Sequence, residues 1–298
     1  MVTNEFMIKK LSILSCLTIF MMGACLILFA TISGAWMYLR PHPPNTTRVL
    51  FTGVTYQREF HKSPRPMIVH VVRINLRDEG IKVLVTPGDP KSDLPLKARK
   101  TSQFLQEFGA QIAINGDGFL PWYSRTILNY YPHDGDRVDV IGQAVSDGVR
   151  YSLPTDDEPT LYFNGRNQAR INQPPGKPQN AISGNQVLVQ QGQALSNLGS
   201  NPEPRTAVGL DKRRNELILV VVDGRQPGYS EGATLDDMAA LMLSLGANEA
   251  LNLDGGGSST LVMEGSNGRP VVLNSPINNG IPGLQRPVGN HLGIFAQP

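Results

Sequence analysis

The sequence predicts an α/β chain of the mixed α+β type, in which a single strand-rich domain with mixed sheets and few helices follows an N-terminal transmembrane helix. Three observations carry this prediction. Short runs rich in β-branched residues recur from Val49 to the carboxyl end. Only two segments show the helical spacing of apolar residues. Residues 11–39 contain no charged side chain.

The uncharged segment 11–39 is long enough for a signal anchor, because about 20 apolar residues span a bilayer. Lys9 and Lys10 precede it, so we expect a cytoplasmic tail over residues 1–10. A signal peptide cleaved near Ser33-Gly34-Ala35 is the alternative, although the apolar region of a signal peptide is only about 7–15 residues long.

An uncleaved anchor would leave the rest of the chain outside the cytoplasm. The proline-rich residues 40–48 are typical of a linker. Residues 49–298 are expected to form one extracytoplasmic domain, whether periplasmic, extracellular or luminal. Both cysteines, Cys16 and Cys25, fall in the anchor, so the sequence excludes a disulfide and a thiolate metal site in the domain.

The charge of the chain excludes one class of partner. The chain holds 27 Lys and Arg against 25 Asp and Glu, and three of those basic residues and one acidic residue lie in the first 40 positions. The domain is therefore formally neutral, and it has no basic block. Nucleic-acid binding calls for a basic stripe, so nucleic acid is not expected as a partner.

The expected strands are the apolar, β-branched runs bounded by turn residues. In the first half of the domain they are Val49–Tyr56, Met67–Leu76, Ile81–Thr86, Gln111–Ile114, Val138–Val145 and Thr160–Phe163. In the second half they are Arg205–Leu210, Glu216–Val222, Glu249–Leu253, Ser259–Met263, Pro270–Leu273 and His291–Phe295.

Two helices are expected among these strands. Leu96–Phe108 has apolar residues on one side and is followed by Gly109, where a helix would stop. Thr234–Leu245 begins at a good N-cap, carries Asp237 in the capping-box position and is followed by Gly246.

The run Leu251–Thr260 is the most informative motif, because a short apolar strand leads through Asn252 and Asp254 into three consecutive glycines. Gly255, Gly256 and Gly257 leave the backbone bare, so its N–H groups could approach an anion closely. A fixed carboxylate beside an anion cradle suits chemistry on a phosphate ester.

Polar side chains also collect at the ends of other expected strands, where a rigid sheet commonly presents functional groups. Asn115 and Asp117 end one strand, Arg205 begins another, and Asp223 and Arg225 end a third.

Taken in order, these motifs resemble the phosphodiester glycosidase family. The resemblance lies in Asn252–Thr260, in Ala113–Phe119 (the family's Asn-Gly-Gly-Phe-Phe segment), in Arg205–Gly209 (its Arg-Thr-Ala segment) and in Val222–Arg225 ahead of the helix at Thr234. It covers roughly residues 67–296. Asp117 departs from the family pattern, Phe119 stands alone, and Gln285-Arg286 replaces the family's frequent Glu-Arg.

The resemblance implies a hydrolase that cuts a sugar-1-phosphodiester between sugar and phosphate. We expect Asp254 as the principal catalytic carboxylate and Asp223 as the second, because glycoside cleavage commonly uses two. The expected substrate-binding residues hold the phosphate, bind sugar hydroxyls or brace the carboxylates; they are Arg205, Arg225, Asn252, Asn115, Asp117, Gly255, Gly256, Gly257 and Ser258.

No cofactor or metal is expected. The five histidines lack the spacing of zinc ligands. Calcium stays an open alternative at His133-Asp134-Gly135-Asp136, although a full ligand set does not follow it. The expected partners are a phosphosugar or glycan substrate and, through the anchor, a membrane, and the oligomeric state is left open.

The favoured function is a membrane-tethered, exported hydrolase of sugar-1-phosphodiester linkages in envelope or exopolysaccharide glycans. Two alternatives stay open. One is a non-catalytic envelope-glycan binding module that kept the fold. The other is a phosphodiesterase that cleaves the P–O bond instead of the C–O bond.

Overall fold

The computed structural model describes residues 17–25, 27–28, 31, 40–126, 128–155 and 157–298. Most of the segment predicted as an anchor, residues 11–39, lies outside this described part, although residues 17–25 are helical. Within the described residues, no helix is both long enough and apolar enough to cross a membrane.

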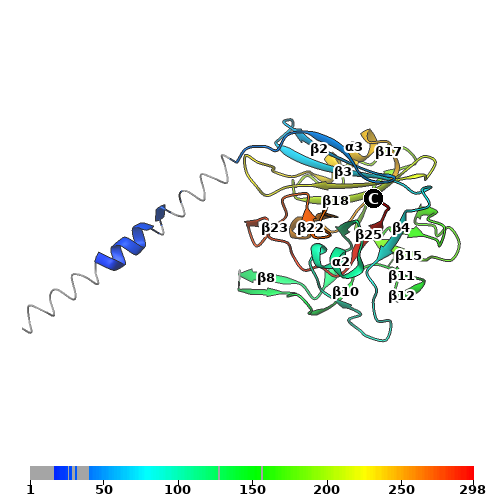
Figure 1. Ribbon diagram of the computed structural model, residues 1–298, viewed down its shortest axis with the longest axis horizontal. Helices are drawn as coiled ribbons and strands as arrows, with labels where there is room; N and C mark the ends of the chain where they lie inside the picture. The colour runs from blue at the N-terminus through cyan, green and yellow to red at the C-terminus, as the bar shows by residue number, and fades with distance from the viewer. Residues whose placement is uncertain (1–16, 26, 29–30, 32–39, 127, 156) are drawn as a thin grey trace, which may run out of the picture.

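The largest sheet has eight strands, and every pairing in it is antiparallel. Its order is β1 (Thr46–Phe51), β2 (Val54–His61), β3 (Met67–Asn75), β19 (Glu216–Val222), β18 (Arg205–Asp211), β20 (Ala247–Asn252), β16 (Gln186–Gln190) and β17 (Gln193–Ala194). In Figure 1 this sheet forms the upper part of the molecule.

A five-stranded antiparallel sheet lies beneath it (Figure 1). Its order is β22 (Pro270–Val272), β21 (Leu261–Glu264), β6 (Ile112–Asn115), β25 (His291–Phe295) and β4 (Lys82–Val85). The main apolar core fills the space between the two sheets. Because strand side chains alternate between faces, Leu217, Leu219 and Val221 of β19 enter this core, whereas its other apolar residues face the opposite side.

Two helices cover the outer faces of these sheets. Helix α3 (Leu235–Ser244) packs on the eight-stranded sheet through Met238, Ala239 and Met242. Helix α2 (Thr101–Phe108) packs on β6 and β21 through Phe104 and Leu105. The four layers are therefore α3, the large sheet, the five-stranded sheet and α2.

A third sheet of five strands flanks the core at the right of Figure 1. Its order is β12 (Val149–Ser152), β11 (Ala144–Ser146), β15 (Asn180–Ser183), β13 (Thr160–Phe163) and β14 (Ala169–Ile171). The smaller sheets are β5 (Leu96–Lys97) with β10 (Arg137–Val140) and β7 (Phe119–Leu120), β8 (Tyr123–Thr126) with β9 (Asn129–Tyr131), and β23 (Ile277–Asn278) with β24 (Ile281–Pro282).

The strand-rich α/β class with few helices is confirmed, and three expected elements differ. The single strand expected at Val138–Val145 is two strands of different sheets, β10 and β11, because the chain bends at Ile141 and Gly142. The single strand expected at Val49–Tyr56 is a hairpin of β1 and β2, because Gly53 adopts φ 73° and reverses the chain. Strand β1 therefore begins inside the segment expected as a linker. The helix expected from Leu96 begins only at Thr101, because Leu96 and Lys97 pair with β10.

Candidate active site

The predicted motifs converge where β18 and β20 of the large sheet meet β6 of the five-stranded sheet. Asn115 ends β6 and is fully buried between the two sheets. Its Nδ2 donates to the backbone oxygen of Asp254 (2.7 Å), and its Oδ1 accepts from Thr206 Oγ1 (2.8 Å) and the Thr260 N–H (3.2 Å). Asn115 therefore fixes the turn that carries Asp254, a position that suits the bracing role expected for it.

A cavity of about 420 Å³ opens at this point. It is lined by Gly118, Phe119, Leu120, Trp122, Ile141, Asn185, Glu203, Arg205, Arg225, Asp254, Gly255, Gly256, Gly257 and Arg286. Two carboxylates and three guanidinium groups thus share the cavity with an apolar wall.

The carboxylate of Asp254 is held by short-range contacts within its own turn. Its Oδ1 accepts the N–H of Gly255 (2.9 Å), and the hydroxyl of Ser258 bonds the same carboxylate. Burial raises the pKa of Asp254, while Ser258, Arg286 and Arg225 pull the pKa down. The result is a carboxylate that is poorly solvated and therefore a stronger base than an exposed one.

Three arginines surround the cavity. Arg286 donates to Asn278 Oδ1 (3.0 Å) and Ser258 Oγ (3.4 Å), and its guanidinium lies 5.0 Å from the ring centroid of Trp122. Arg205 donates to two backbone carbonyls, and Arg225 is ion-paired with Glu203. Three fixed guanidinium groups provide the donors that a phosphate diester requires.

Two of the three glycines do not offer their N–H groups to an anion. The N–H of Gly255 bonds Asp254, and that of Gly256 bonds the Pro204 carbonyl (2.8 Å), so neither is free for a ligand. A side chain at Gly257 would place its Cβ 2.4 Å from an Arg286 nitrogen. The bare backbone therefore lets arginine side chains approach closely, and the positive charge comes from them.

Asp223, expected as the second catalytic carboxylate, does not line the cavity. It is 1% exposed, and its Oδ2 lies 3.2 Å from His70 Nε2. Its Oδ1 accepts from the Ser275 N–H (2.8 Å) and Asn274 Nδ2 (3.0 Å). With both oxygens engaged inside the protein, Asp223 acts as a buried structural acceptor and the geometry does not support contact with substrate.

Asp117 and Asn252 also lie behind the cavity wall. Asp117 is 1% exposed and accepts the N–H groups of Gly118 (2.7 Å) and Gly142 (2.8 Å); burial raises its pKa to about 7. Asn252 is fully buried and donates to Asn185 Oδ1 (2.9 Å). Neither side chain lines the cavity, and of the two roles expected for them the geometry favours bracing over contact with a sugar.

Two charged groups of the cavity were missed from the sequence. Glu203 stands two positions before Arg205, but the pattern of strand ends gave it no distinct signal. Arg286 does follow Gln285 at the position of the family's Glu-Arg pair, and that match was a usable signal.

In the described part of the chain, no group of three or more His, Cys, Asp or Glu side chains is arranged to hold a metal ion. At the turn considered for calcium, Asp136 pairs with His133 (3.3 Å) and Asp134 pairs with Lys100 (3.1 Å).

Comparison with known families decides the identity of this domain. The sequence profile of the phosphodiester glycosidase family matches residues 108–295, well over half of the chain. The chain belongs to the phosphodiester glycosidase family. The resemblance predicted from the motifs is thereby confirmed, and with it the hydrolase class of the family.

Individual relatives agree with this assignment. Bovine N-acetylglucosamine-1-phosphodiester alpha-N-acetylglucosaminidase is 45% identical over 62 residues, which are 21% of this chain and 11% of that protein. The chain thus matches only about a tenth of the length of this curated relative.

Two solved structures share the fold of the chain. A hypothetical protein from Synechocystis has a TM-score of 0.62 at 18% identity, covering 86% of this chain and 64% of that one. The catalytic domain of zebrafish N-acetylglucosamine-1-phosphodiester alpha-N-acetylglucosaminidase, auto-inhibited by its pro-peptide, has a TM-score of 0.58 at 20% identity, covering 87% and 86%. At such identities the likeness concerns the fold.

Proposed function

We propose that the cavity at Asp254 hydrolyses sugar-1-phosphodiesters between the sugar carbon and the phosphate oxygen. The observation that carries the proposal is one half-buried carboxylate, Asp254, facing a cavity that also holds Arg205, Arg225 and Arg286. A glycosidase for this linkage needs a carboxylate near the sugar and positive charge near the departing phosphate. The family match supports the same reaction class.

The proposed chemistry divides the work between these groups. The C–O bond breaks with its electron pair on the phosphate oxygen, and the three arginines stabilise the negative charge that this leaves. A phosphate is a good leaving group, so a strong general acid is unnecessary. Asp254 stabilises the oxocarbenium-like carbon or takes the proton of the water that attacks it. Glu203 is the second carboxylate of the cavity, in place of Asp223, and orients Arg225.

We further propose, from the uncharged segment 11–39 and the Lys pair before it, that the enzyme is tethered to a membrane with its domain outside the cytoplasm. Its substrates would then be phosphosugar linkages of envelope or exopolysaccharide glycans. The name of the bovine relative makes N-acetylglucosamine the first sugar to test.

The test is release of free sugar by the full chain from a panel of N-acetylglucosamine, glucose and mannose 1-phosphodiesters. Asp254→Asn should lower the rate by about 10²–10⁴-fold, the usual contribution of a catalytic carboxylate. Asp93→Asn, a change at an exposed carboxylate outside the cavity, is the control and should leave the rate unchanged.

Two results would contradict the proposal. Turnover that survives Asp254→Asn would remove the carboxylate from the reaction. Binding of the diesters without turnover, equal in the parent and in Asp254→Asn, would favour the glycan-binding module.

A further inference from the structure

A second cavity, of about 620 Å³, lies at the opposite end of the central strands from Asp254. Arg205 begins β18 at the active site, whereas Arg213 and Arg214 lie in the turn that joins β18 to β19. Seven strand residues separate the two ends, which is about 20 Å at roughly 3.3 Å per residue. The second cavity is therefore separate from the catalytic one.

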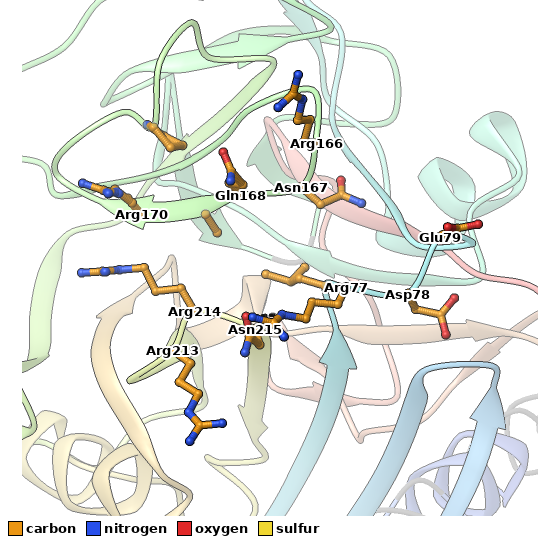
Figure 2. Close-up of a pocket in the computed structure, with 13 residues that line it drawn as sticks. Arg77, Asp78, Glu79, Arg166, Asn167, Gln168, Arg170, Arg213, Arg214 and Asn215 are labelled. Carbon is orange, nitrogen blue, oxygen red and sulfur yellow. Dashed lines mark hydrogen bonds between the residues drawn. The ribbon is translucent and has the colours of Figure 1, made fainter.

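Arginine side chains come to this cavity from three segments that are far apart in the sequence. Arg77 follows β3, Arg166 and Arg170 belong to the β13–β14 hairpin, and Arg213 and Arg214 form the β18–β19 turn. Figure 2 shows the hairpin arginines above the cavity and Arg77 and Arg214 below it. The β18–β19 turn is thus one wall of a basic cavity.

Few of these guanidinium groups are neutralised. Arg214 pairs with Glu249 (3.2 Å), and Arg77 donates to the neutral amide of Asn215 (2.7 Å). For Arg166 and Arg170, no carboxylate among the described residues forms an ion pair. Five arginines face only two lining carboxylates, those of Asp78 and Glu79, on a domain that is formally neutral. The positive charge is therefore concentrated here.

The cavity continues into a second hollow of about 590 Å³, because Arg170 and Arg214 line both. The second hollow is rich in side-chain amides, which come from Asn172, Gln173, Gln190, Gln191 and Asn248. Lys212 and Glu249 also line it, and Glu249 is the partner of Arg214. Together the two hollows form a groove that offers guanidinium donors first and mostly neutral amides next. We call this the arginine groove.

The chemistry of the groove selects one class of ligand. Guanidinium groups match phosphate oxygens, and amides match the donors and acceptors of sugar hydroxyls. Among the residues described, no aromatic side chain lines either hollow, so the bases of a nucleic acid would find no stacking surface. We propose that the arginine groove binds a phosphate-bearing glycan chain, about one strand length away from the catalytic cavity.

This inference rests on the proposed function only in naming the same chemical class for both sites. A polymeric substrate held in the groove would be retained near Asp254 between cleavage events. A monomeric diester is too small to occupy both sites, so its hydrolysis should not depend on the groove.

The test measures binding of a synthetic poly(glycosyl phosphate) oligomer to the full chain carrying Asp254→Asn, so that the ligand is not consumed. The double variant Arg166→Gln/Arg170→Gln removes two arginines of the groove. Among the described residues, neither guanidinium forms a hydrogen bond, so the change should leave the fold intact. It should weaken binding about tenfold or more. It should also flatten the salt dependence of binding. The matched control Arg150→Gln/Arg269→Gln removes two exposed arginines elsewhere.

Equal binding by the parent and the Arg166→Gln/Arg170→Gln variant, or no binding of the oligomer at all, would overturn the inference. A thymidine oligonucleotide that binds as tightly as the glycan oligomer would overturn the ligand class. Hydrolysis of a monomeric diester is measured separately, in proteins that keep Asp254. The Arg166→Gln/Arg170→Gln variant should hydrolyse it as fast as the parent does. If the parent does not hydrolyse it, the proposed function is refuted, whereas the binding result still stands.

Discussion

Arg286 shows how one side chain can serve both the shape and the charge of the cavity. Its guanidinium lies over Trp122 at 5.0 Å, bonds Asn278 and stands close to the bare backbone of Gly257. Burial lowers the pKa of Arg286, and the nearby Asp254 carboxylate raises it. Because the group remains charged, it stabilises ionised Asp254, and in the proposed reaction it would also attract the phosphate of the substrate.

Replacing Arg286 by alanine should therefore damage catalysis more than folding. We expect kcat/KM for a monomeric sugar-1-phosphodiester to fall by about 10²-fold, since a charge-assisted contact to the departing phosphate is lost. Arg269→Ala, at an exposed position, is the control and should change little. Steady-state kinetics would decide, and equal values for the two variants would contradict a role for Arg286.

Asp117 makes a prediction about stability and pH. Its pKa is raised to about 7 by burial, whereas an unfolded aspartate has a pKa of about 3.9. Between about pH 4 and pH 7, Asp117 is protonated in the folded protein and ionised in the unfolded chain. The free energy of unfolding therefore falls as the pH rises through this window.

Asp117→Asn cannot titrate, so it should reduce this pH dependence. It should also cost about 1–3 kcal/mol at pH 5, because the new amide cannot accept both the Gly118 and the Gly142 N–H. Urea unfolding at pH 5 and pH 8 measures both effects, with Asp93→Asn as the control. If the free energy of unfolding changes between pH 5 and pH 8 by the same amount in Asp117→Asn as in the parent, the raised pKa is disproved.

Among the structural elements, the turn after β20 determines where Asp254 lies in the cavity. It runs from Asp254 through the 3₁₀ turn η1 (Gly256–Ser258), and Gly256 adopts φ 59°, a conformation that glycine tolerates well. The turn is anchored at Gly116, Asn115 and Pro204, which belong to other segments. Its shape is therefore fixed by the fold, and it presents Asp254 to the cavity without adjustment.

Gly257→Ala tests this element directly. The added methyl would stand 2.4 Å from an Arg286 nitrogen, so the flexible arginine must move while the backbone can stay. We expect kcat/KM to fall by up to about 10²-fold, the effect of misplacing a catalytic group by about 1 Å, with little loss of thermal stability. Gly165→Ala, where a Cβ meets no atom within 4 Å, is the control. Wild-type kinetics in Gly257→Ala would contradict the account.

The sequence predicted this element better than its surroundings. The triple glycine and Asp254 are adjacent in the chain, so local chemistry reveals them. Asp223 also follows a strand, but it falls on the face of β19 that meets His70 of β3, and the choice of face depends on strand pairing. Arg286 lies 32 positions from Asp254, so only the tertiary fold brings them together.

At the scale of the whole molecule, two sheets packed face to face hold a catalytic cavity at one end and the arginine groove at the other. The apolar core between the sheets is a single cluster of buried residues from both sheets, and it supports the elements that carry both sites. Asn115 links the sheets at the catalytic end through Thr206 and Asp254. This arrangement suits the proposed enzyme, which would bind a long phosphate-bearing glycan in the arginine groove and cleave it at a fixed distance from that groove.

In the proposed reaction at Asp254, the bond between the sugar carbon and the phosphate oxygen breaks. The decisive measurement is hydrolysis of a sugar-1-phosphodiester in ¹⁸O-labelled water, followed by mass spectrometry of both products. Cleavage of the C–O bond places the label in the sugar and leaves the phosphate product without it. Label in the phosphate would show cleavage of the P–O bond and would contradict the assignment of Asp254 and the three arginines to a glycosidase mechanism.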